Sequence, residues 1–293
     1  MKYDIKKDTY KLYKKNTNFF INIGLQVTRN CNLHCIHCCE PERMLDLSLI
    51  KIKKVIDKLS DGGLKKICIT GGEPFLRKDI VEICRYIHNK GMLATLSTNG
   101  FLLNKKKILE IKPYVDNIRF SLHGTEEIHN QIVKNKKGFE KVIGSIKMAT
   151  DLGMPVSVVA SIFNRNHQTM LDIAKICEEQ KVEKLYFFSL ISRGRAHPIY
   201  DKEYMPFKNI QTSFKKIINI AKKESWNLDM NLVDWSIEGQ CVLVFPDGRL
   251  AGVPSFQDKD NTNIIGNILK ESPSNLWNKY LFKDNYINYY KNH

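Results

Sequence analysis

The sequence predicts an α/β fold: a partial TIM-like (β/α)6 barrel with a small C-terminal cap formed by a hairpin and helices. Between residues 19 and 190, short runs of β-branched and apolar residues alternate six times with segments of helical periodicity. Such alternation is typical of parallel strands joined by right-handed crossovers, and six units are fewer than the eight of a closed barrel. The alternation stops after residue 191, so we divide the chain into an N-terminal arm (1–18), a barrel core (19–195) and a cap (196–293).

The elements of the core follow in a regular order. Strands are expected at 19–28, 66–70, 92–97, 117–122, 156–163 and 184–189, and helices at 47–59, 79–89, 105–111, 138–152 and 169–180. The cap is expected to hold a helix at 207–224, a hairpin at 241–252 around a Pro-Asp-Gly turn, a helix at 273–280 and a final Tyr-rich helix. In sheets of this kind, ligands bind at the carboxyl ends of the strands.

The bulk properties narrow the function classes. The chain of 293 residues has no apolar run of the roughly 20 residues that span a bilayer, so no membrane association is expected. Its basic start lacks the apolar stretch of a signal peptide, and a cytoplasmic location is expected. The net charge of +15 comes mostly from scattered lysines, and no nucleic-acid-binding motif accompanies it. We therefore expect a solvated basic surface rather than a nucleic-acid partner.

A group of cysteines follows the first expected strand. Cys31, Cys35 and Cys38 have the spacing C-x3-C-x2-C, and Cys39 comes next. Thiolates this close on one loop can hold a metal centre, and soft sulfur ligands favour zinc or an iron–sulfur cluster. A structural zinc site needs a fourth protein ligand, which His34, His37 or Cys39 could supply. Three thiolates on a 4Fe–4S cluster would instead leave one iron open for a ligand.

Further motifs stand at the ends of the next three strands. They are Gly71-Gly72-Glu73-Pro74, the segment from Ser97 through Asn99 to Gly100, and the segment from Ser121 through His123 to Gly124. Glycine lets the backbone approach a neighbour closely, and serine and asparagine supply polar groups. Each motif alone is also compatible with an ordinary turn or turn cap. Their convergence on one rim indicates a functional site.

These motifs together resemble the radical SAM superfamily. The resemblance implies that Cys31, Cys35 and Cys38 hold one 4Fe–4S cluster whose open iron binds S-adenosylmethionine. Reduction of the cluster would cleave the sulfonium to a 5′-deoxyadenosyl radical, which abstracts a substrate hydrogen. It further implies cofactor-binding roles for a set of residues: Gly71, Gly72 and Pro74 in the turn, Glu73 on the methionyl ammonium, Ser97, Asn99 and Ser121 on the ribose or the methionine carboxylate, and Ile162 beside the adenine.

Residues 239–281 resemble the start of the SPASM extension found in peptide-modifying relatives of that superfamily. In the extension, additional cysteines bind auxiliary clusters, but here Val253-Pro254-Ser255 occupies the corresponding place and no cysteine follows Cys241. The resemblance is therefore to a truncated SPASM-like segment, and a single cluster is expected. As candidate catalytic residues we take Cys241, which could donate a hydrogen atom, and His123, which could reach the substrate from the rim.

The resemblance implies maturation of a ribosomal peptide, with a peptide or small molecule as substrate and an electron donor such as flavodoxin or ferredoxin. One alternative is modification of a tetrapyrrole or another small metabolite. A second is a zinc- or cluster-binding protein without enzymatic activity.

Overall fold

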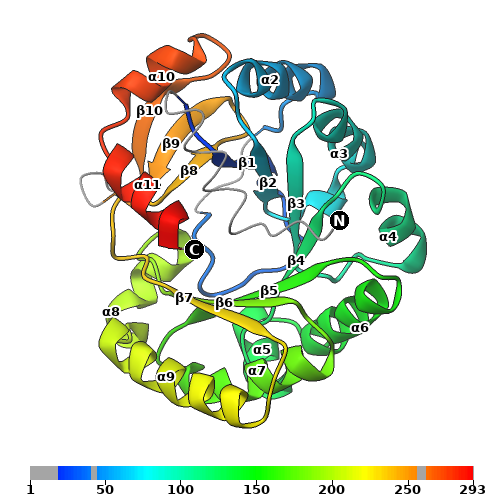
Figure 1. The fold of residues 1–293 in the computed structure, drawn as a ribbon, viewed down its shortest axis with the longest axis vertical. Coiled ribbons are helices and arrows are strands. Elements are labelled where there is room, and N and C mark those ends of the chain that lie inside the picture. Colours follow the sequence, from blue (N-terminus) through cyan, green and yellow to red (C-terminus); the bar gives the residue numbers. More distant parts are fainter. Residues whose placement is uncertain (1–18, 41–44, 256–261, 293) are drawn as a thin grey trace.

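The computed structural model describes residues 19–40, 45–255 and 262–292, so the predicted arm (1–18) lies outside the described residues. The described strands form one ten-stranded sheet in the order β10-β9-β8-β1-β2-β3-β4-β5-β6-β7. Figure 1 shows the sheet curving round into an arc, with helices α2 to α9 on its outer side. The predicted α/β partial barrel is confirmed.

Seven strands along the chain lie parallel to their neighbours: β1 (Asn22–Thr28), β2 (Lys66–Gly71), β3 (Leu93–Thr98), β4 (Asn117–Ser121), β5 (Val156–Ile162), β6 (Lys184–Ser189) and β7 (Asp229–Val233). The helices between them are α2 (Leu49–Asp61), α3 (Ile80–Asn89), α4 (Lys105–Ile111), α5 (Glu126–Val133), α6 (Gly138–Asp151), α7 (Met170–Glu179), α8 (Tyr200–Glu203) and α9 (Phe207–Lys223). The short 3-10 turns are η1 (Pro74–Leu76), η2 (His167–Thr169) and η3 (Gly194–Ile199). The loops that follow the carboxyl ends of the parallel strands therefore lie at one edge of the sheet.

The C-terminal segment is part of the same sheet. The strand β8 (Cys241–Val244) pairs parallel with β1, while β9 (Arg249–Val253) and β10 (Asn263–Asn267) continue antiparallel beyond it. The helices α10 (Pro273–Lys279) and α11 (Lys283–Asn292) end the chain. Because β7 also follows residue 195, the sheet runs through the boundary expected there. We did not expect β7, β10 or α5; in β7, polar Asp229 and Asn231 interrupt the apolar pattern.

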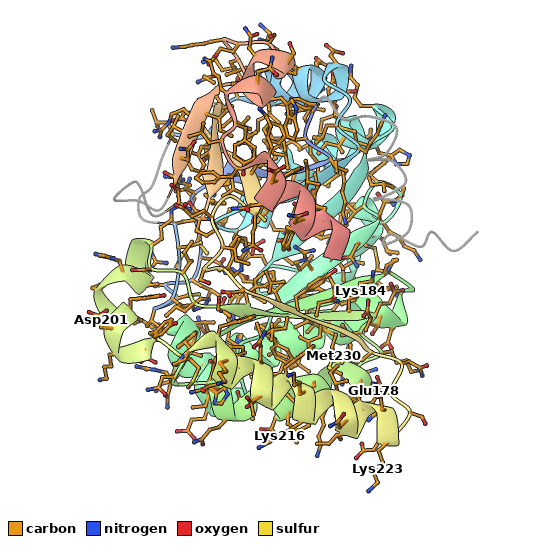
Figure 2. The ribbon with its side chains drawn as sticks, turned by 60° about the vertical axis from the view of Figure 1, so that its left-hand side comes forward. Glu178, Lys184, Asp201, Lys216, Lys223 and Met230 are labelled. Carbon is orange, nitrogen blue, oxygen red and sulfur yellow. The ribbon has the colours of Figure 1, made fainter. Side chains whose placement is uncertain are left out.

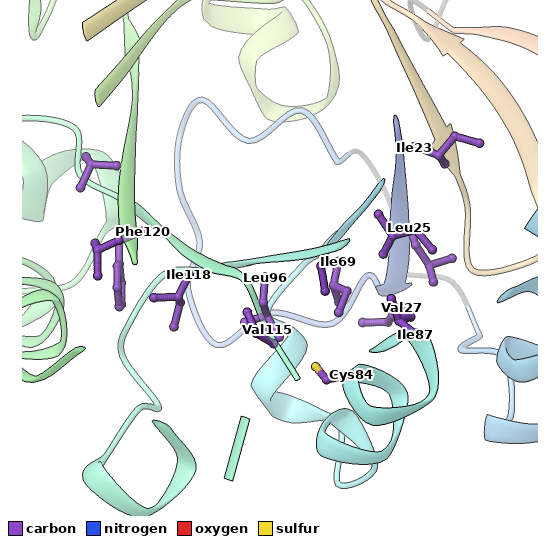
Figure 3. Close-up of a cluster of buried hydrophobic side chains, with 14 of the residues drawn as sticks. Ile23, Leu25, Val27, Ile69, Cys84, Ile87, Leu96, Val115, Ile118 and Phe120 are labelled. Carbon is purple, nitrogen blue, oxygen red and sulfur yellow. The ribbon is translucent and has the colours of Figure 1, made fainter. Parts of the chain in front are cut away.

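The two faces of the sheet differ in polarity, and this places the core. In β2, Ile67 and Ile69 are fully buried, whereas the alternate residues Lys66 and Cys68 are half-buried on the interior side. Figure 3 shows Leu25, Val27, Ile69 and Leu96 of the first three strands clustered with Cys84 and Ile87 of α3. Burying one such aliphatic side chain contributes roughly 1.5–3 kcal/mol. The core therefore lies between strands and helices, and the interior face is left to polar groups.

Two helices frame the far side of the barrel. Figure 2 shows α9, with Lys216 and Lys223 on its outer side, lying against the strands that carry Lys184 and Met230. Figure 1 shows α11 lying between the β8–β10 end of the sheet and β7, beside the interior. Within the described residues, no helix is long and apolar enough to cross a membrane.

Candidate active site

The cysteine loop leaves β1 at the carboxyl edge of the parallel strands. Cys31, Cys35 and Cys38 are free thiols, each half-buried. Within the described part of the chain, no three or more His, Cys, Asp or Glu side chains are placed so that together they could hold a metal ion. The loop is fixed from four sides, by the turn after β2, the loop after β3, helix α5 and the turn η3.

The turn after β2 holds the start of the loop through its backbone. The amide of Gly72 donates to the Thr28 carbonyl at 2.8 Å, and the amide of Glu73 donates to the Asn30 carbonyl at 2.8 Å. A Cβ at Gly71, where φ is +135°, would lie 2.0 Å from the Thr28 oxygen, and one at Gly72 would lie 2.1 Å from the Asn30 oxygen. We expected these glycines to admit a ligand; in the structure the backbone they admit is the one that leads into Cys31.

The Glu73 carboxylate is fully buried and joins this turn to the loop after β3. It accepts hydrogen bonds from the Phe75 amide at 3.1 Å, the Thr98 hydroxyl at 2.9 Å and the Asn99 amide at 2.8 Å. The Asn99 side chain in turn donates to Asn32 Oδ1 at 2.9 Å and lies 3.8 Å from Cys31 Sγ. The Glu73 carboxylate thus has three intramolecular hydrogen-bond donors. It reaches the cysteine loop through one of them, Asn99.

Glu73→Gln should destabilise the protein by about 1–3 kcal/mol, because the amide nitrogen would face donors that now bond a carboxylate. Burial raises the pKa of Glu73, although its three hydrogen bonds oppose the shift. A carboxyl with a raised folded-state pKa loses stability as pH rises from about 4.3 through that pKa. The deficit of the variant should therefore shrink with increasing pH. Urea unfolding of both apoproteins between about pH 4.5 and 7 measures this, and a pH-independent difference would contradict it.

Helix α5 supports the middle of the loop. The Ile36 amide donates to the Ile132 carbonyl at 3.0 Å, and the Ile36 side chain packs against a small buried cluster that includes Ile132, Phe163 and Leu190. The ring of His37 lies 4.2 Å from that of His123, centre to centre. His123 Nδ1 accepts from the Ser161 amide at 3.3 Å, and its carbonyl accepts from Asn166 at 2.8 Å.

Three imidazoles therefore lie together behind the loop. His123 and His129 stack with their ring centres 5.9 Å apart, and His129 Nδ1 accepts from the His123 amide at 3.1 Å. Burial lowers the pKa of His37 and of His129 to about 4 and holds that of His123 well below its ordinary value, so all three are neutral. His123 is 4% exposed, and its contacts are with His37 and the end of β5. It supports the loop from within.

The turn η3 closes the fourth side. The Arg195 amide donates to the Cys38 carbonyl at 2.9 Å, and Arg195 Nε donates to the Cys35 carbonyl at 2.9 Å. Gly194, at φ +59°, lies so close that a Cβ would meet the Cys38 oxygen at 2.7 Å. Burial, helped by the thiols of Cys38 and Cys31 and opposed by Arg195, raises the pKa of Cys35 to about 12. Three thiols on one loop suit an iron–sulfur centre, whose iron stabilises the thiolate form, and the Arg195 cation favours the same thiolates.

Arg195→Gln should lower the midpoint potential of a cluster held by this loop. A unit charge several ångströms away, at an effective dielectric constant of about 20, contributes roughly 1–2 kcal/mol, which corresponds to tens of millivolts. Potentiometric titration followed by EPR measures the shift. Arg195→Lys keeps the charge and should recover most of it; equal potentials in wild type and Arg195→Gln would show that Arg195 does not act through charge.

The loop end is also tied to the C-terminal hairpin, which sequence reasoning missed. Glu40 pairs with Arg29 at 3.2 Å and with Arg193 at 3.7 Å. Both guanidinium groups lie over the Phe245 ring, at 4.7 and 5.6 Å from its centre. Only the clustering of Arg193, Gly194 and Arg195 after a strand hinted at this role. The hairpin thus contributes to the support of the cysteine loop.

Three other predicted residues, Ser121, Ser97 and Ile162, lie in different surroundings. Ser121, at the end of β4, is half-buried on the interior side, and Ser97 Oγ lies 3.5 Å from Cys68 Sγ, deeper in the interior. Ile162 is fully buried among core residues, on the same side of β5 as Val158 and Ala160. Its place beside the adenine stays a prediction, with its side chain in the core.

Cys241 is not brought to the site. It begins β8, two residues before Leu243, which pairs with Gly24 near the amino end of β1, whereas the cysteine loop follows the carboxyl end. Its thiol hydrogen-bonds Tyr290 of α11, and burial raises its pKa to about 12. The expectation that Cys241 acts beside the cluster loop is therefore not supported by its position.

Comparison with curated proteins gives relatives of several kinds. The chain is 28% identical over 276 residues to the antilisterial bacteriocin subtilosin biosynthesis protein AlbA of Bacillus subtilis, covering 89% of this chain and 60% of that protein. It is 29% identical over 182 residues to Fe-coproporphyrin III synthase of Methanosarcina barkeri, covering 60% of this chain and 46% of that protein. The chain therefore spans about half to three fifths of the length of these relatives.

Solved structures share the fold. SuiB of Streptococcus suis, bound to its precursor peptide SuiA, superposes with a TM-score of 0.76 at 14% identity, over 92% of this chain and 68% of that one. The enzyme anSMEcpe, with bound AdoMet and a peptide, has a TM-score of 0.71 at 14% identity, over 92% and 83%. A sequence profile described as the radical SAM superfamily matches residues 25–179, more than half of the chain. The chain belongs to the radical SAM superfamily, whose members work with a 4Fe–4S cluster and S-adenosylmethionine.

Proposed function

We propose that Cys31, Cys35 and Cys38 hold one 4Fe–4S cluster and that this protein is a radical SAM enzyme acting on a peptide. The observation that carries the proposal is the fixation of the cysteine loop from four sides at the carboxyl edge of the barrel. When bound, the cluster would supply one electron to S-adenosylmethionine, whose sulfur–C5′ bond would break to give methionine and the 5′-deoxyadenosyl radical that abstracts hydrogen. A small redox protein such as flavodoxin or ferredoxin would deliver that electron.

The polar groups at the same rim would bind S-adenosylmethionine. Asn99 lies beside Cys31 and is held there by Glu73, and Ser121 ends β4 on the interior side. The Ser121 hydroxyl has no hydrogen-bond partner among the described residues, so it is free to bond a ribose or carboxylate oxygen. The backbone around Ile162 would border the adenine. In this arrangement Glu73 is a positioning residue for Asn99 and does not touch the ligand directly.

A peptide substrate is favoured by how far the resemblances extend. The AlbA alignment covers 89% of the chain, and the peptide-bound SuiB and anSMEcpe structures each match 92% of it. All three matches are long enough to include the C-terminal hairpin. The alignment with Fe-coproporphyrin III synthase covers 60% of the chain. Modification of a tetrapyrrole therefore remains the second candidate function, supported by the core alone.

Anaerobic reconstitution tests the proposal. The loaded protein should contain about four irons and four sulfides per chain, and dithionite with S-adenosylmethionine should release 5′-deoxyadenosine. Zinc bound without iron, or a fully loaded cluster that cleaves nothing, would refute the proposed chemistry. Addition of a peptide encoded beside the gene, or of coproporphyrin III, then separates the two substrate classes by which one accelerates deoxyadenosine release.

A further inference from the structure

A cluster of polar side chains lines the interior of the barrel below the candidate site. It consists of Cys68 on β2, Arg119 on β4, Tyr186 on β6 and Asn231 on β7, which we call the inner cluster. The neighbours Ile118 and Phe120 are fully buried in the core, so Arg119 projects to the opposite, interior side. Its guanidinium carbon lies 5.2 Å from the centre of the Tyr186 ring, and Nη1 lies 3.9 Å from Cys68 Sγ.

The one cation of the inner cluster, Arg119, lacks an anionic partner among the described residues. Among the described residues, Arg119 makes no ion pair, and its Nε is buried without a hydrogen-bond acceptor. Asn231 is 7% exposed, and its Nδ2 is likewise buried without an acceptor. Asn231 stands in register with Tyr186, and the Arg119 guanidinium lies over the Tyr186 ring, so both residues with an unsatisfied donor are neighbours of Tyr186. Buried donors without acceptors cost about 1–3 kcal/mol each, which an incoming acceptor would recover.

The surroundings strengthen the positive field. Burial, with Arg119 nearby, lowers the pKa of Lys66 to about 8. Lys184 Nζ lies 4.0 Å from Asp229 Oδ2, so the carboxylate on that side already has a cationic partner. At the bottom, Tyr290 of α11 hydrogen-bonds Cys241, and the charge of Arg119 acts on Tyr289. Aromatic rings therefore lie near a guanidinium whose Nε has no acceptor among the described residues.

We propose that the inner cluster binds a carboxylate of the substrate, with Arg119 and Asn231 as the donors. The planar guanidinium matches a carboxylate in a two-bond arrangement, and the Asn231 amide adds a third donor. The inference rests on the proposed function only in taking the barrel interior as the place where substrate binds. A single guanidinium set among tyrosines suits a carboxylate on an organic body better than a multiply charged phosphate.

The position of Arg119 relates this contact to the chemistry. Arg119 pairs with Ser97 on β3, and Asn99, which reaches Cys31, comes two residues later. Two residues of strand correspond to roughly 6.5 Å. A carboxylate held at Arg119 would place an atom several bonds away from it at the level of the cysteine loop. The carboxylate could be the C-terminus or an acidic side chain of a peptide, or a propionate of a tetrapyrrole.

Calorimetric titration of the reconstituted holoenzyme tests the proposal with four probes. These are N-acetyl-Gly-Phe-Gly and its C-terminal amide, and coproporphyrin III and its tetramethyl ester. At least one free acid should bind about tenfold or more tighter than its neutral partner, and the acid that does so identifies the source of the carboxylate. Arg119→Gln should bring that ratio close to one. Arg85→Gln is the matched control, because Arg85 lies at the same 5.2 Å from a tyrosine ring, that of Tyr114, on the outer surface.

Several results would overturn the proposal: equal binding of acid and neutral forms for both pairs, no binding of any probe, or an unchanged ratio in Arg119→Gln. GTP is titrated as a fifth probe that carries phosphate, and GTP binding tighter than either acid, lost in Arg119→Gln, would overturn the proposal in favour of a phosphate site. If Arg119→Gln does not fold, Asn231→Asp serves, since its added charge should weaken the free acids and leave the neutral probes unaffected. Deoxyadenosine release without substrate is measured separately, so failure here is distinct from failure of the proposed chemistry.

Discussion

Replacing Cys31, Cys35 and Cys38 together by alanine should reduce protein-bound iron after reconstitution from about four atoms per chain to near zero. Thiolates are the ligands of iron–sulfur clusters, and these three share one loop whose backbone is held at Cys35 and Cys38 by Arg195. Deoxyadenosine release should fall to the level of a protein-free control. Iron and sulfide analysis, together with the visible absorption of the cluster, measures the loss.

The other cysteines provide the controls. Cys84 and Cys177 are buried in the core, and Cys39→Ala removes the thiol next to Cys38 without touching the spaced triplet. Cys39→Ala should keep the full iron content, and circular dichroism should show that the triple variant is folded. Iron retained by the triple variant would mean that Cys39, Cys241 or another group holds a cluster, and that the expectation of a single cluster is wrong.

Sequence reasoning succeeds where the local pattern and the tertiary environment agree. The expected helix at 105–111 and strand at 184–189 coincide with α4 and β6, because apolar residues on each element's core side alternate with polar ones at the proper period. The strand β7 was not predicted, because its Asp229 and Asn231 face the interior of the barrel and a strand with such a polar face resembles a loop in sequence. One of these two polar residues, Asn231, belongs to the inner cluster.

The site was predictable in its location and less so in its contacts. Parallel strands bring their carboxyl ends to one edge, so the order of the motifs sufficed to gather the Cys31, Gly72 and Asn99 loops. Which partner each side chain chooses depends on long-range packing. Glu73 therefore turned out to bond Thr98 and Asn99, and Arg195 came to the loop from more than 150 residues away, at a sequence separation of 160 from Cys35.

Gly72→Ala should displace the cysteine loop and cost more than an ordinary surface substitution. The new Cβ would lie 2.1 Å from the Asn30 carbonyl oxygen and 2.6 Å from its carbon, and both are backbone atoms that no side-chain rotation can move. The loop must shift by more than an ångström. This shift also breaks two hydrogen bonds, one from the Gly72 amide to the Thr28 carbonyl and one from the Glu73 amide to the Asn30 carbonyl. We expect a loss of about 1–3 kcal/mol or more in the free energy of unfolding, and a severalfold loss of bound iron.

Two glycine variants separate the causes of this loss. Gly144→Ala lies within α6 with no atom near its new Cβ, and it should stabilise the protein by about 0.5–1 kcal/mol. Gly91→Ala also meets open space but keeps φ at +71°, so it reports backbone strain alone, roughly 1–2 kcal/mol, without loss of iron. If Gly72→Ala matched Gly91→Ala in stability and kept its iron, close approach of the two backbones would not be what positions Cys31. Loss of iron in Gly72→Ala alone would instead show that cluster binding depends on the geometry of this one turn. All three variants add one methyl group, so a difference in iron content between them could not come from the size of the substitution.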